Sequence, residues 1–198
     1  LSTTYKCQEQ FSCQVKIKLL PCAPVRSVLN LDMTKTEALD LIGGLSNPSK
    51  MPCFSYSIPA QKCITGMKLR DVVGSICSKC YALKGMYGFP VVKEALQRRF
   101  ESLTNPRCVE AMTIAINAKD KSGFFRWHDS GDLQGVWHLK NIVQVARNLP
   151  NISFWLPTRE YAMVSEFLKT DKLPENLTVR LSALMLEAAP PIAIATRL

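Results

Sequence analysis

The chain has 198 residues, of which 47% are hydrophobic and 21% are charged. This composition excludes a largely disordered chain and predicts globular structure of ordinary domain size. The net charge of +9 favours anionic partners, either a small anionic ligand or nucleic acid. Charged residues or prolines interrupt the long apolar stretches, so we expect no membrane-spanning helix. No secretory signal is visible either.

The first segment, residues 1–35, is basic and weakly periodic. We predict an N-terminal extension there, with one short strand at 13–20. Residues 36–198 are predicted to form a single α/β domain. A short helix is expected at 35–41, because Gly43 and Gly44 follow as a stop signal.

Strands and helices alternate after residue 90. Pro90 begins one helix, and Asn105-Pro106 is typical of the start of the next. Apolar strands are predicted at 124–127, 152–156 and 177–181, with helices between them. Such alternation predicts parallel strands joined by right-handed crossovers. The expected fold is therefore α/β, either a partial (β/α) barrel or an open, mostly parallel sheet flanked by helices.

About four strands are too few to close an eight-stranded barrel, so we expect an open sheet or one completed in a homo-oligomer. A polar segment follows each predicted strand, namely His128 to Asp132, Pro157 to Glu160, and Ser182. Parallel sheets and barrels bind ligands at the carboxyl ends of their strands. These three segments therefore predict the position of the functional site.

Three of the eight cysteines form a pattern that is typical of a metal site. Cys77 and Cys80 form a C-x-x-C motif, and thirteen residues separate Cys63 from Cys77. Three thiolates would leave one coordination position open, which suits an iron–sulfur cluster, of the four-iron, four-sulfur kind. We expect this cysteine-bearing loop after the first strand, which makes the domain a metal-cluster domain.

Three other interpretations of these cysteines stay open. A structural zinc site would need a fourth ligand, for which Cys53 is the nearest cysteine. A thioredoxin-like redox pair would use Cys77 and Cys80 and leave Cys63 unexplained. Free cysteines buried in the core are the third interpretation, although the polar sequence of 74–82 argues against it. Cys108 stands alone and is expected in the core.

The chain also resembles a family of bacteriophage and prophage proteins named after mycobacteriophage gene product eighty-eight. The resemblance covers about 44–182, and its most specific segments are 45–52, 74–82, 125–133, 154–160 and 179–182. It implies a phage origin more firmly than an activity. Since the expected host is a bacterium, we expect the protein in the bacterial cytoplasm.

A more distant similarity is to the radical S-adenosylmethionine enzymes, in which a cysteine loop after the first strand holds a four-iron cluster. Their second strand ends in a glycine-rich acidic turn that contacts the methionine part of the cofactor. Ser130, Gly131 and Asp132 occupy the corresponding place in chain order, and the cysteine spacing departs from the usual motif. The similarity implies that S-adenosylmethionine binds at these residues and at residues that follow later strands, namely Thr158, Arg180 and Ser182.

The candidate catalytic residues are His128, Asp129, Asp132 and Arg159. His128 is either a general base or ligand, or a structural residue that closes the turn after its strand. Arg126 either binds an anionic ligand or forms a buried ion pair with Asp132 or Glu160. Three further residues have structural expectations: Tyr81 shields the cluster, Trp155 belongs to the core, and His138 lies at the surface or between helices.

Two classes of function follow. The first is an iron–sulfur protein with radical S-adenosylmethionine-like or electron-transfer chemistry. The second is an accessory protein without catalysis, in which zinc or a cluster stabilises a nucleic-acid-binding or redox-sensing module. The residues alone leave open whether the chain is an enzyme.

Overall fold

The strands of this protein form one parallel sheet in the order β1-β2-β3-β4, which is also their order in the sequence. The computed structural model describes residues 32–189 and 191–196. The strands of the described residues are β1 (Phe54–Tyr56), β2 (Phe124–Trp127), β3 (Ser153–Thr158) and β4 (Leu177–Leu181). The α-helices are α1 (Lys35–Leu41), α2 (Ile64–Leu69), α3 (Pro90–Ser102), α4 (Cys108–Lys119), α5 (Val136–Asn148), α6 (Tyr161–Leu168) and α7 (Ile192–Ala195).

Local sequence signals set several of these boundaries. Thr34 and Glu37 form a capping box that begins α1, and Pro90 occupies the first turn of α3. The predicted α1 and β4 have the bounds found in the structure, and β2 does as well. The start of α4 was predicted too early, because Asn105 caps a preceding turn through a hydrogen bond from the Arg107 amide at 2.9 Å.

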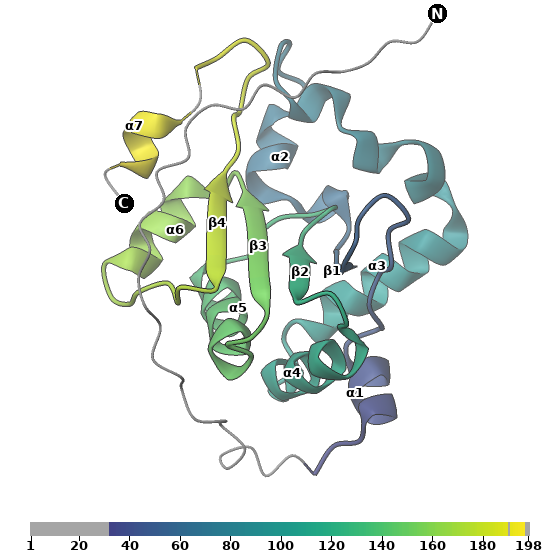
Figure 1. Ribbon diagram of the computed structural model, residues 1–198. Helices are drawn as coiled ribbons and strands as arrows, with labels where there is room; N and C mark the ends of the chain where they lie inside the picture. The colour runs from purple at the N-terminus through teal and green to yellow at the C-terminus, as the bar shows by residue number, and fades with distance from the viewer. Residues whose placement is uncertain (1–31, 190, 197–198) are drawn as a thin grey trace, which may run out of the picture. The chain divides into compact units, whose positions relative to one another are not determined.

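The helices α4, α5 and α6, which directly precede β2 or connect the strands from β2 to β4, lie on one face of the sheet. Right-handed crossovers between consecutive neighbouring parallel strands place their helices on the same side. Figure 1 shows α4, α5 and α6 alongside the strands, with the arrowheads of β2, β3 and β4 pointing the same way. The sheet is therefore open, and the expected barrel is not closed by the described residues.

The two faces of the sheet differ in burial because side chains alternate along each strand. The helix-covered face carries buried residues that pack on α4, α5 and α6: Tyr56, Phe125, Trp127, Phe154, Leu156 and Leu177. The opposite face, called the open face below, is buried at Ser55 but half-buried or exposed at Arg126, Trp155, Pro157, Thr178 and Arg180. Trp155 was expected in the core, but it is half-buried on the open face.

A buried polar network ties α3 to the start of the sheet. The Tyr56 hydroxyl donates to the Ile42 carbonyl at 2.7 Å. Arg99 is buried on α3, and its guanidinium donates to the carbonyls of Gly43 and Gly44 and, at 2.6 Å, to the Ser46 hydroxyl. Each of these contacts satisfies a polar group that burial would otherwise leave unpaired.

Some predictions fall on residues that the structure does not describe. The strand expected at 13–20 lies outside the described residues, as do Cys7, Cys13 and Cys22. The 1–35 extension lies almost wholly outside them, so its boundary stays a prediction. Among the described residues, no helix is both long and apolar enough to cross a membrane.

Candidate metal and ligand site

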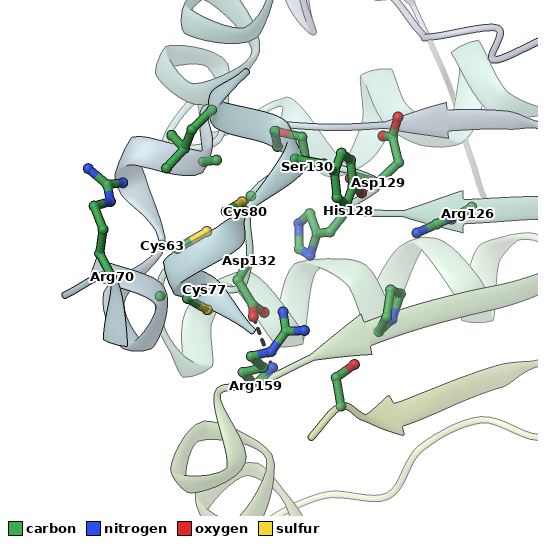
Figure 2. A pocket seen from close by; sticks show the side chains of 18 residues that line it. Cys63, Arg70, Cys77, Cys80, Arg126, His128, Asp129, Ser130, Asp132 and Arg159 are labelled. Carbon is green, nitrogen blue, oxygen red and sulfur yellow. Dashed lines mark hydrogen bonds between the residues drawn. The ribbon is translucent and has the colours of Figure 1, made fainter. Parts of the chain in front are cut away.

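A cavity of about 200 Å³ lies at the carboxyl ends of the strands. Its lining includes all three cysteines of the predicted metal site and most of the residues predicted at the strand ends (Figure 2). The predicted residues that line it are Cys63, Cys77, Cys80, His128, Asp129, Ser130, Gly131, Asp132, Arg159 and Ser182. Thr158 and Arg180 are not among the lining residues.

The cysteines come from the long connection that follows β1. Cys63 precedes α2, and Cys77 begins a 3₁₀ turn that Cys80 ends. Ser75 fixes this turn because its hydroxyl donates to the Leu69 carbonyl at 2.5 Å and accepts from the Ser78 amide at 3.0 Å. The same segment pairs with the chain after β4, where Ser75 bridges to Met185.

Gly66 leaves room beside two of the sulfur atoms. A β-carbon at this position would lie 3.6 Å from the Cys77 sulfur and 3.7 Å from the Cys63 sulfur. It would also lie 2.8 Å from the Cys63 β-carbon, closer than atoms normally approach. Glycine therefore keeps the space next to these thiols free of a side chain.

The pKa values of the thiols respond to burial and to nearby charges. Burial, together with neighbouring Asp132, Cys80 and Cys77, raises the pKa of Cys63 to about 12. Burial also raises the pKa of Cys77, although the positive charges of Arg159 and Arg70 oppose this shift. Cys63 is thus a neutral thiol at neutral pH unless a cation replaces its proton.

Asp132 joins the ends of β2 and β3. Its carboxylate accepts from the Thr158 hydroxyl at 2.5 Å, from the Arg159 amide at 2.9 Å and from the Leu133 amide at 2.8 Å. Burial raises the pKa of Asp132 to about 6 in spite of these donors. Asp132 was predicted as a candidate for catalysis and for cofactor binding. In the structure its carboxylate oxygens accept hydrogen bonds from other groups of the protein. Thr158, which donates one of these hydrogen bonds to Asp132, is itself buried.

Ser130 and Gly131 attach the loop after β2 to the chain after β1. The Ser130 hydroxyl donates to the Ile58 carbonyl at 2.9 Å. Gly131 has φ of 85°, and a β-carbon there would lie 2.2 Å from the Ile58 side chain. Both the backbone conformation and the close approach therefore require glycine.

His128 is buried at the cavity wall, and neither of its ring nitrogens has a hydrogen-bond partner in the described residues. It has φ of 54°, in the left-handed region that is strained for a non-glycine residue. The ring of His138 lies 5.3 Å away, between ring centroids. His138 was expected at the surface or between helices; it is buried, which excludes the surface position. Burial lowers the pKa of both residues, that of His138 to about 4.

Asp129 and Glu160 each accept hydrogen bonds from the long connection after β1. The Asp129 carboxylate accepts from Ser55 at 3.3 Å and from Tyr87 at 3.4 Å, and its backbone carbonyl accepts from the Tyr81 hydroxyl. The Glu160 carboxylate accepts from the amide of Thr65 at 2.7 Å and from its hydroxyl at 2.8 Å. Glu160 thereby holds α2, which carries Gly66.

The other cysteines of the described residues lie away from this cavity. Cys53 precedes β1, at the amino end of that strand, and Cys108 is buried in the core as predicted. Cys53 therefore does not join the three cysteines as a fourth ligand. In the described part of the chain, no group of three or more His, Cys, Asp or Glu side chains is close enough to hold a single metal ion.

Three contributors to the site were not predicted from the sequence. Gly66 lies between Cys63 and Cys77, and a glycine within a short helix signals close packing. Glu160 lay in a polar segment predicted at the site, but its only expected role was an ion pair with Arg126, and the described residues contain no such pair. No sequence pattern indicated a role for Arg70 at this site.

Comparison with known proteins shows the family of this chain. The family described as Gene product 88 matches residues 29–189, a range that includes every residue of the cavity wall. The chain belongs to this family. The match is wider than the 44–182 expected from the sequence, and it confirms the phage gene product family. No curated protein and no solved structure matches the chain, and the similarity of this Gene product 88 member to radical S-adenosylmethionine enzymes stays a prediction.

Proposed function

We propose that Cys63, Cys77 and Cys80 hold a four-iron, four-sulfur cluster at the carboxyl ends of the parallel strands. The observation that carries the proposal is that these three thiols line one cavity, whereas Cys53 and Cys108 lie elsewhere. Cysteine thiolates are the usual ligands of iron–sulfur clusters. Three of them leave one iron available to a small molecule.

The number of cysteines at the cavity favours a cluster over one structural zinc ion. A structural zinc site takes four ligands, whereas three cysteines line the cavity and Cys53 lies elsewhere. In a four-iron cluster each thiolate binds a different iron atom. Gly66 supports this assignment because a larger residue would fill the space beside two of the sulfurs.

The pKa values favour metal-bound thiolates over a free redox pair. A thioredoxin-like cysteine reacts as a thiolate and needs a lowered pKa, but burial raises the pKa of Cys77 and that of Cys63. Metal ions displace thiol protons when they bind. The nearby charges of Arg159 and Arg70 would then stabilise the thiolates.

We further propose that S-adenosylmethionine binds at the open iron, and that the protein carries out radical or electron-transfer chemistry. The cluster, when bound, supplies a single electron. The chain's own residues keep the site in place: Asp132 joins two strand ends, and Glu160 fixes α2 beside the cysteines. Tyr81 lines the cavity and donates to the Asp129 carbonyl, a position from which it would limit access of water to the cluster.

The test is anaerobic purification followed by iron, sulfide and zinc analysis, with absorption and EPR spectra. Cys77→Ala is compared with Cys53→Ala, a cysteine outside the cavity. We expect iron and sulfide near one cluster per chain in the wild type and in Cys53→Ala, and their loss in Cys77→Ala. Titration with S-adenosylmethionine should then change the EPR spectrum of the reduced cluster.

Two other outcomes would replace this proposal. Stoichiometric zinc without sulfide would favour the metal-stabilised nucleic-acid-binding module. A cluster whose EPR spectrum does not respond to S-adenosylmethionine would favour a redox-sensing accessory protein.

A further inference from the structure

Arg126 has no anionic partner among the described residues, although it lines the cavity at the strand ends. It projects from β2 on the open face, and its Nε atom is buried without a hydrogen-bond partner. The one hydrogen bond that its side chain makes in the described residues is a weak contact of 3.3 Å to the Met51 sulfur. The guanidinium stands over the Trp155 ring, 4.7 Å from its centroid. Arg126 also lines the cavity that holds the three cysteines.

The nearby carboxylates are all engaged by other donors. Asp129 accepts from Ser55 and Tyr87, and the carboxylate of Asp132 accepts from Thr158 and two backbone amides. Glu160 accepts from Thr65. The three ion pairs of the described residues involve none of these groups and do not involve Arg126.

A second polar group near this position is also unpaired. Ser57 directly follows β1, and its hydroxyl is buried without a partner in the described residues. Arg126 pairs in register with Ser55, two residues before Ser57, so alternation places Ser57 on the same face. Leaving a buried donor unpaired costs free energy, and a ligand that accepts from it recovers that cost.

We propose that Arg126 binds the carboxylate or phosphate group of a small anionic substrate at the open-face end of the cavity. A guanidinium offers parallel N–H donors whose geometry matches both groups. Trp155 lies against one face of the guanidinium, and Arg126 lines the cavity in which the ligand would bind. Figure 2 shows Arg126 on one side of His128 and the cysteines on the other, so one cavity can serve a cluster and a second ligand.

The substrate assignment rests on the proposed cluster, but the anion site does not. The distinction can be measured in one preparation of the full chain, by determining iron and sulfide alongside ligand binding. A wild-type protein without iron that binds anions through Arg126 would overturn the proposed function alone. A protein with a full cluster that binds no anion would overturn the present inference alone.

The experiment is isothermal titration of the anaerobically purified protein with inorganic phosphate, succinate, adenosine 5′-monophosphate and adenosine. Arg126→Gln is the test variant, and Arg180→Gln, an exposed arginine of the same face outside the cavity, is the matched control. We expect saturable binding of an anionic probe, and a dissociation constant raised about ten- to a hundredfold in Arg126→Gln. Arg180→Gln should bind like the wild type.

The probes separate the two sources of the anion. Binding of phosphate and adenosine 5′-monophosphate identifies a phosphorylated substrate, whereas binding of succinate alone identifies a carboxylate. Equal weakening by both variants would overturn the inference, since it indicates diffuse attraction by positive charge. Binding of S-adenosylmethionine alone, lost in Arg126→Gln, would also overturn it, because Arg126 would then serve the cofactor. Unchanged iron content and melting temperature of Arg126→Gln confirm that the variant folds.

Discussion

The helix-covered face and the open face of the sheet come from the same alternating strands, yet they have opposite characters. On the covered face, residues such as Phe125 and Phe154 are buried against helices and against one another, with ring centroids 5.8 Å apart. On the open face, Arg126 and Trp155 stay half-buried, and Arg180 is exposed. Strand alternation therefore separates a stabilising surface from one that is available to ligands.

Arg99 and Arg126 differ in whether the buried atoms of their guanidinium groups have hydrogen-bond acceptors. Arg99 is buried with acceptors for its guanidinium, supplied by Gly43, Gly44 and Ser46. Arg126 has a buried Nε without an acceptor among the described residues. A buried polar group that is fully paired contributes to a defined fold, whereas an unpaired one at a cavity wall is consistent with a ligand that supplies the missing acceptor.

The largest expected effect separates the two faces by stability. Phe125→Ala should lower the free energy of unfolding by about 3–5 kcal/mol, because it leaves a cavity in the core. Trp155→Ala on the open face should lower it by less than about 2 kcal/mol, because its ring is only half-buried. Urea denaturation measures both. Equal losses would mean that the open face is also part of the core.

A second prediction concerns pH and the buried His138. The pKa of this residue is about 4 in the folded chain, below its ordinary value of 6.5. Between these values the unfolded chain binds a proton that the folded chain does not, so the free energy of unfolding falls as pH falls from 6.5 to 4. His138→Phe should remove a loss on the order of 3 kcal/mol over this window.

The measurement for His138 is urea denaturation of both proteins at pH 7 and pH 4. Asp132 acts in the opposite direction, because its raised pKa favours the folded chain at low pH and this contribution disappears as pH rises toward 6. It is present in both proteins, so the difference between them isolates His138. Parallel pH profiles would contradict the prediction.

The two arginines provide the third prediction. Arg99→Gln should lower the free energy of unfolding by about 2–3 kcal/mol, since it leaves buried carbonyls without donors. Arg126→Gln should change it by less than about 0.5 kcal/mol, because no acceptor loses a strong partner. Thermal and urea denaturation give both values. A large loss in Arg126→Gln would assign it a structural role.

The smallest expected effect on stability comes from Gly66→Ala. Alanine favours the helix by up to about 1 kcal/mol, and this offsets the tight contact with the Cys63 β-carbon. Iron content should nevertheless fall to about half or less, because the added methyl group enters the space beside two sulfurs. Gly88→Ala, which has no atom within 4 Å of the added carbon, is the control. Full iron content in Gly66→Ala would contradict the inference that Gly66 leaves space for the cluster.

The sequence was most informative where periodicity and turn chemistry act locally. The helix from Pro90, the strand 124–127 and the polar segments after the strands were all predictable, and the polar segments meet at one cavity. β1 was not, because its three residues are too few to show a period. The hydrogen bonds that occupy Asp132 depend on Thr158 and Arg159, which are distant in sequence, so pattern alone assigned Asp132 to a ligand.

The proposed cluster binds in one cavity at the strand ends, through Cys63, Cys77 and Cys80. Its most direct test is iron and acid-labile sulfide per chain, measured anaerobically in five single alanine variants. These are the variants of the cysteines that the structure describes: Cys53, Cys63, Cys77, Cys80 and Cys108. Alanine at Cys63, Cys77 or Cys80 should abolish the cluster, while alanine at Cys53 or Cys108 should leave it intact. Equal iron content in all five variants would contradict this prediction.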